Sequence, residues 1–154
     1  MPRDRAPTTW GRMTMSSCLR PEHEFAEHTG EERLVIRSPT LGSLFAEAGR
    51  ALAELEGVSG PPASDAPCRV IEVTATDQAS LLVEWLNELI FLAEHERWVP
   101  TEFQAELATQ TKLRMRARGR VLPEAPSQVK AATHHDLKVD SHDGAFEAQV
   151  VLDV

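Results

Sequence analysis

Two acidic groups meet at the C-terminal end of the chain, which reads Gln149-Val150-Val151-Leu152-Asp153-Val154. If this apolar segment is a packed strand, the side chain of Asp153 and the α-carboxylate of Val154 become fixed neighbours. Paired hard oxygen anions attract a hard cation such as Ca²⁺ or Mg²⁺. The tail by itself is more typical of an ordinary last strand with a solvated terminus, so the cation site is a hypothesis at this point.

Five cations occupy every second position of a segment that has the pattern of a strand: Lys112, Arg114, Arg116, Arg118 and Arg120. Residues two apart in a strand share a face, so these side chains form a basic ridge. One interpretation is a docking surface for phosphate or for an acidic partner. The other interpretation, which we favour, is a solvated outer face, for example that of an edge strand whose charges prevent aggregation.

The histidines suggest a zinc site only superficially. His134 and His135 are adjacent, His142 follows, and His23 and His28 lie near the start. Neighbours in a strand face opposite ways, so His134 and His135 need a bulge to bind one ion. The chain also lacks a cysteine pair and a His-Glu-x-x-His motif, which disfavours zinc.

Catalytic motifs are equally scarce. There is no Gly-x-Ser-x-Gly elbow and no glycine-rich phosphate loop, which disfavours nucleophilic catalysis and nucleotide binding. Asp77 precedes a helical segment and is more typical of an N-cap than of a catalytic acid. Asn87 and Glu88 lie off the apolar stripe of that helix, where capping or surface roles are the usual ones.

The elements that position these residues follow from hydrophobic periodicity. Apolar residues at helical spacing predict helices from Thr40 to Gly57 and from Asp77 to Glu96. Earlier strand candidates are Glu24–Ala26, Leu34–Arg37 and Arg69–Ala75. After Pro100 a period of two predicts an antiparallel meander of four strands: Glu102–Ala108, Thr111–Val121, Ala131–Asp140 and Ala145–Leu152. We therefore predict an α+β fold, with two helices packed on mostly antiparallel sheet.

Composition restricts the function classes. The 154 residues carry a net charge of −8, which argues against sequence-independent nucleic-acid binding by the whole protein. Two isolated cysteines indicate a reducing compartment, and no segment is apolar enough for a membrane span or a secretory signal. We expect a soluble cytoplasmic protein, with residues 1–21 a disordered extension and 22–154 a single domain.

Three parts of the chain together resemble the archease family. They are Glu27–Glu31, Leu81–Leu89, and the segment Val129–Val139 followed by Val150–Val154 at the end. Glu27-His28-Thr29-Gly30-Glu31 is similar to the His-Thr-Ala-Asp motif of that family, and Leu81–Leu89 is similar to its helix signature. The order and spacing match over about residues 23–154.

The resemblance implies an accessory protein rather than an enzyme. Archeases activate the RtcB-type RNA ligase, promoting its guanylylation and its multiple turnover in tRNA splicing and RNA repair. The family's metal site corresponds to Glu31, Asp153 and Val154, with calcium the first candidate ion and magnesium or manganese the alternatives. Glu31 stands where the family has Asp, which lengthens the side chain by one methylene, and His134 stands where a Tyr is usual.

Other residues are candidates for contact with such a ligase, and the candidates are His28, Lys130, His135, Arg114, Arg116 and Arg118. We expect no membrane association and no strong direct nucleic-acid binding, and the sequence leaves the oligomeric state open. Two other functions stay open. One is a metal-dependent hydrolase that uses Glu31 and Asp153. The other is a stand-alone chaperone or RNA-binding module that acts through the Arg114–Arg120 part of the basic ridge.

Overall fold

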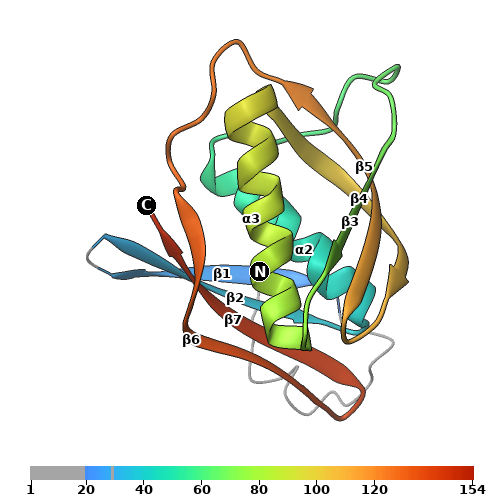
Figure 1. The fold of residues 1–154 in the computed structure, drawn as a ribbon, viewed down its shortest axis with the longest axis vertical. Helices are drawn as coiled ribbons and strands as arrows, with labels where there is room; N and C mark the ends of the chain where they lie inside the picture. The colour runs from blue at the N-terminus through green and yellow to red at the C-terminus, as the bar shows by residue number, and fades with distance from the viewer. Residues whose placement is uncertain (1–19, 29) are drawn as a thin grey trace, which may run out of the picture.

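The structure is a computed structural model that describes residues 20–28 and 30–154. In chain order the described elements are β1 (Glu22–His28), β2 (Glu31–Ser38), α2 (Leu41–Leu55), β3 (Arg69–Thr74), α3 (Gln78–Glu96), β4 (Trp98–Ala108), β5 (Lys112–Val121), β6 (Ala131–His142) and β7 (Ala145–Asp153). Figure 1 shows α2 and α3 filling the space between two separate sheets. The α+β class is confirmed, and residues 1–19 of the predicted extension lie outside the described residues.

Both helices begin where the sequence predicts. The Thr40 hydroxyl accepts a hydrogen bond from the Ser43 N–H, and the Ser43 hydroxyl oxygen accepts one from the Thr40 N–H. These two bonds form a capping box. Asp77 caps α3 by accepting from the Ser80 N–H at 2.8 Å. This bond is the main cause that lowers the pKa of Asp77. An ionised cap is poorly suited to act as a general acid, which favours the structural role.

The first sheet has the strand order β1-β2-β7-β6, and all of its pairings are antiparallel. The last strand of the chain therefore lies between two others. Its inward residues are buried against the helices, because Ala148, Val150 and Leu152 are no more than 1% exposed. This interior position removes both edges of β7 from solvent and fixes its register.

The second sheet has the order β3-β5-β4. The strand that carries the basic ridge is β5, the central strand, so the suggestion of a charged edge strand is wrong. The expectation of one meander after Pro100 is also wrong, because β4 and β5 pair in this sheet while β6 and β7 pair in the other. Residues 122–130 connect the two sheets. Because this segment has no periodicity, nothing in the sequence indicated that the chain passes from one sheet to the other there.

The core lies between the sheets and around the helices. Trp85 of α3 is fully buried, and its indole N–H donates to the Phe45 carbonyl of α2 at 2.9 Å. Helix α2 packs on β4 and β2, and α3 packs on β6, β4 and β3. Within residues 20–28 and 30–154, no helix combines the length and apolar character needed to cross a bilayer.

Candidate metal-binding edge at the C-terminus

The tail of the chain lies beside the first acidic candidate. In the register of the first sheet, Asp153 is directly opposite Glu31 on one side and Ala131 on the other. Directly opposite residues in an antiparallel pair present their side chains to the same face, with Cβ atoms about 4.5–5.5 Å apart. The sheet therefore brings together two carboxylates that are 122 positions apart in the sequence, and Ala131 leaves the β6 side of Asp153 unobstructed.

Backbone hydrogen bonds fix the position of the terminus. The Val154 N–H donates to the Gly30 carbonyl at 3.3 Å, and the Lys130 N–H donates to the Asp153 carbonyl at 2.8 Å. Figure 1 places the C-terminus beside the start of β6 and near the turn between β1 and β2. Val154 is 39% exposed, so its α-carboxylate lies at the surface on an anchored backbone. We call Glu31, Asp153 and this α-carboxylate the carboxylate edge.

Two local features of the sequence position this edge. Gly30 has a φ of +72°, a left-handed conformation that favours glycine in the turn leading into β2. The Asn87 side chain of α3 holds the start of β6, because its amide donates to the Ala132 carbonyl at 3.2 Å and its oxygen accepts from the Ala132 N–H at 2.8 Å. The general expectation of a capping or surface role missed this clamp, since nothing in the sequence pairs Asn87 with Ala132.

The two side chains of the carboxylate edge have no contacting counter-charge among the side chains that the structure describes. Neither Glu31 nor Asp153 forms an ion pair or a side-chain hydrogen bond with any residue that the structure describes. Two close anions without a counter-charge favour a cation between them. Three oxygen ligands are available if the α-carboxylate joins the two side chains, and this hard donor set fits Ca²⁺, Mg²⁺ or Mn²⁺.

The α-carboxylate is essential to that fit. Among the described residues, no group of three or more His, Cys, Asp or Glu side chains lies together in a way that could hold an ion. A site at the carboxylate edge therefore depends on the last residue of the chain supplying a main-chain ligand.

The histidine pair lies in a bulge of β6. The register with β7 is interrupted between Thr133 and Lys138, and Asp136 within this interval has a φ of +52°. His135 is exposed and its Nε2 is 3.3 Å from Asp136. The bulge removes the geometric objection to zinc, but the described residues around it supply no three-ligand group.

His23, near the start of the chain, contacts two glutamates and has a structural role. His23 Nδ1 is 2.6 Å from Glu47 and Nε2 is 3.1 Å from Glu54, both on α2. The hydrogen bond to Glu47 is the largest cause that raises the pKa of His23. Burial acts to raise the pKa of Glu47, but hydrogen bonds from His23 and Arg50 outweigh it and lower that pKa. This cluster fastens β1 to α2.

The partner-contact candidates divide into two groups. His28 is the register partner of Glu31, and Lys130 is exposed at the start of β6, so both flank the carboxylate edge. Exposed His135 lies in the bulge of the same sheet. Arg114, Arg116 and Arg118 belong to the other sheet.

Three of the five cations of the basic ridge form ion pairs with acidic neighbours. Arg114 pairs with Glu72 at 2.5 Å, Arg116 with Glu106 at 3.5 Å, and Arg118 with Glu102 at 2.8 Å. Arg118 also donates to the carbonyls of Ala63, Ser64 and Ala66, and Arg120 donates to the Pro61 carbonyl. These bonds hold the loop between α2 and β3, which indicates a structural role for the C-terminal half of the ridge.

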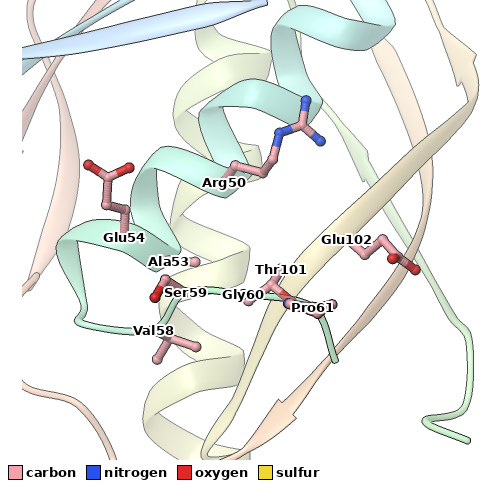
Figure 2. Close-up of a pocket in the computed structure, with 9 residues that line it drawn as sticks. All are labelled: Arg50, Ala53, Glu54, Val58, Ser59, Gly60, Pro61, Thr101 and Glu102. Carbon is pink, nitrogen blue, oxygen red and sulfur yellow. The ribbon is translucent and has the colours of Figure 1, made fainter. Parts of the chain in front are cut away.

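A pocket of about 260 Å³ lies between the end of α2, the following loop and β4, and its lining includes partners of His23 and of the ridge arginines. Figure 2 shows that the charged groups of Arg50, Glu54 and Glu102 do not converge on one point. Each of them already has a partner, respectively Glu47, His23 and Arg118. The Thr101 hydroxyl at its wall is buried without a hydrogen bond. The pocket offers no arrangement comparable to the carboxylate edge.

Comparison with known proteins supplies the family. Residues 23–154 match the sequence model of the Archease protein family (MTH1598/TM1083). The chain is 30% identical to the protein archease of Methanosarcina mazei over 145 residues, covering 86% of this chain and 96% of the relative. It is also 30% identical to the protein archease of Methanopyrus kandleri over 139 residues, covering 85% and 98%.

Two solved structures have the same fold. The solution structure of Methanobacterium thermoautotrophicum protein 1598 is 26% identical, with a TM-score of 0.66, and the match covers 86% of this chain and 98% of that one. The crystal structure of a Thermotoga maritima archease, described there as a possible chaperone, has a TM-score of 0.59 at 21% identity, covering 84% and 94%. At this identity the second likeness shows the fold alone.

Proposed function

Because the chain belongs to the archease family, we propose that it is an accessory protein that activates an RtcB-type RNA ligase. In this role it promotes guanylylation of the ligase and its multiple turnover, in tRNA splicing and RNA repair, and catalyses no reaction of its own. The observation that carries the proposal is the register of the first sheet, which sets Glu31 opposite Asp153 beside an anchored C-terminus.

In the proposal, Glu31, Asp153 and the α-carboxylate of Val154 bind one divalent cation, with Ca²⁺ first and Mg²⁺ or Mn²⁺ as alternatives. A bound ion would supply a positive charge that orients oxygen groups of the partner. The chain's own contribution is rigidity, since the backbone bonds of Val154, Asp153 and Ala132 prevent the ligands from separating. The longer side chain of Glu31 can bind through both of its oxygens.

The test is a ligation assay with purified ligase in which RNA substrate exceeds ligase, performed with and without this protein. We expect more turnovers per ligase and faster transfer of GMP from GTP to the ligase. Asp153→Ala, and separately one glycine added after Val154, should abolish the gain because each removes or displaces a ligand. Wild-type protein that leaves both rates unchanged contradicts the proposal.

A matched control is Asp140→Ala. Asp140 is an exposed acid of β6 whose register partner is Glu147, at the far end of the same sheet from the carboxylate edge. This change removes one negative charge from the same sheet without touching the proposed ligands, so we expect full activation. The isolated protein should show no hydrolysis of RNA or nucleotides, and turnover by the protein alone would favour a hydrolase instead.

A further inference from the structure

One cation lies next to the carboxylate edge without contacting it. Arg33 is on β2 two residues from Glu31, and its register partner Val151 is two residues from Asp153. Glu31 and Arg33 are two apart on β2, and Val151 and Asp153 are two apart on β7, so each pair lies on one face of its strand. Because the two pairs are opposite each other, all four side chains lie on the same face of the sheet. Diagonal neighbours of this kind are within reach of a long side chain. The guanidinium of Arg33 is therefore long enough to pair with Glu31 or Asp153.

Arg33 is instead turned toward the β6 bulge. Its Nη2 is 3.5 Å from the Asp136 carboxylate, and this is the carboxylate that Arg33 contacts among the described residues. Its Nε is buried without a hydrogen-bond acceptor. A buried donor left unsatisfied is costly, so this orientation of Arg33 needs a compensating attraction. Asp136 supplies the opposite charge.

The bulge is built to keep Asp136 in place. Its positive φ of +52° is a conformation that Asp and Asn adopt more readily than most residues. The Gln149 side-chain amide of β7 donates to the Asp136 carbonyl at 2.9 Å, and the His135 N–H donates to the Thr133 hydroxyl at 3.3 Å. The carboxylate of Asp136 is thus held on the sheet face that carries Arg33.

From this arrangement we propose that Asp136 is a positioning residue that draws Arg33 away from the carboxylate edge and so leaves that edge free for a divalent cation. Without the charge of Asp136, Arg33 turns to Glu31 and Asp153, satisfies its own donors and competes with the metal. The inference rests on the proposed metal site, but it concerns residues that are not ligands.

The experiment is a double-mutant cycle measured by calorimetric titration of the metal-free full-length protein with Ca²⁺ alone. Asp136→Asn keeps the side-chain shape and tolerates the positive φ. We expect it to weaken Ca²⁺ binding about three- to tenfold, as a competing ion pair would. Arg33→Gln alone should change the affinity less than about twofold, yet in the Asp136→Asn background it should restore nearly wild-type affinity.

The double-mutant cycle distinguishes a movement of the Arg33 side chain from the through-space effect of its charge on the bound ion. If Arg33 acts only through space, Arg33→Gln will tighten binding by the same factor in both backgrounds, and that additive result overturns the inference. Asp143→Asn, the same chemical change at another exposed positive-φ position in the β6–β7 turn, should leave the affinity unchanged. A loss there equal to that of Asp136→Asn also overturns it.

A measurement without metal keeps the two proposals distinguishable. In metal-free protein the NMR signal of the Arg33 Nε–H, identified by its loss in Arg33→Gln, should shift in Asp136→Asn because Nε gains an acceptor. An unchanged signal contradicts the inference even where Ca²⁺ binds. A shifted signal in a protein whose wild type binds no Ca²⁺, Mg²⁺ or Mn²⁺ supports the Arg33 movement and rejects the proposed metal site.

Discussion

The basic ridge of β5 and the carboxylate edge at the end of β7 both concentrate charge, but their surroundings differ. The ridge arginines pair with Glu72, Glu106 and Glu102, or donate to loop carbonyls. The two side chains of the carboxylate edge have no such partner among the described residues, and the nearby cation Arg33 contacts Asp136 instead. In the sequence the ridge is the more conspicuous feature, with five cations at alternate positions.

The number of charges in a segment is therefore a poor guide to a binding site. A charge that neighbours already compensate has little left to offer a ligand, because binding would first have to break its existing contacts. An uncompensated group at a rigid position retains its full attraction.

The side chain of Asn87, which holds the start of β6 beside the carboxylate edge, should have the largest effect on stability. Asn87→Ala removes both hydrogen bonds to Ala132 and leaves a partly buried N–H and carbonyl without partners. We expect a loss of about 2–3 kcal/mol in the free energy of unfolding, measured by urea titration. Glu88→Ala, one position further along α3, should change it by less than about 0.5 kcal/mol. A loss below about 1 kcal/mol for Asn87→Ala would show that Asn87 does not hold the start of β6.

Another carboxylate, outside the carboxylate edge, has no ion-pair partner among the described residues and is buried. Glu56, the C-cap of α2, is 8% exposed. Burial first, and then the charge of Glu94, raises its pKa from 4.5 to about 7. Since the folded pKa lies above the unfolded one, Glu56 stabilises the fold most when protonated, and wild-type stability should fall as the pH rises from 4.5 to 7.

Glu56→Gln removes that titration. At pH 8 we expect the variant to be more stable than wild type by about 2 kcal/mol in urea unfolding, with the difference gone below about pH 4.5. Glu94→Gln should have a smaller effect in the same direction. A gain that is equal at both pH values would mean that packing, and not ionisation, is responsible.

Two arginines of the basic ridge should contribute unequally to the stability of the fold. Arg118 holds three loop carbonyls and Glu102, whereas Arg116 has an exposed ion pair with Glu106 at 3.5 Å. Arg118→Ala should cost about 1–2 kcal/mol of unfolding free energy, and Arg116→Ala less than about 0.5 kcal/mol. Equal effects in thermal or urea unfolding would contradict a loop-anchoring role for Arg118.

The smallest effect concerns RNA. If the ridge is compensated, the isolated protein should bind single-stranded RNA weakly, and changing both Arg114 and Arg116 to Ala should alter the dissociation constant by less than about twofold. Fluorescence anisotropy at several salt concentrations measures this. Tight binding with a steep salt dependence that flattens in the double variant would restore the ridge as a nucleic-acid surface.

Much of the fold follows from local pattern. The helix from Thr40 and the helix from Asp77 begin at the predicted caps, and the alternating segments after Pro100 are strands within a few residues of the expected bounds. These features depend on near neighbours in the chain. The suggestion that β5 is an edge strand failed, because alternation reports which way side chains point and carries no information about which strands lie on either side.

The candidate site shows the same division. The acidic tail, the residue types of the carboxylate edge and the likeness to the archease family can be recognised from the amino-acid order alone. Three pairings depend on the folded chain: Glu31 lies opposite Asp153, Asn87 clamps Ala132, and Arg33 turns to Asp136, 103 positions away. Each of these pairings joins residues far apart in the chain, and strand register and helix docking fix them through the burial of a shared core.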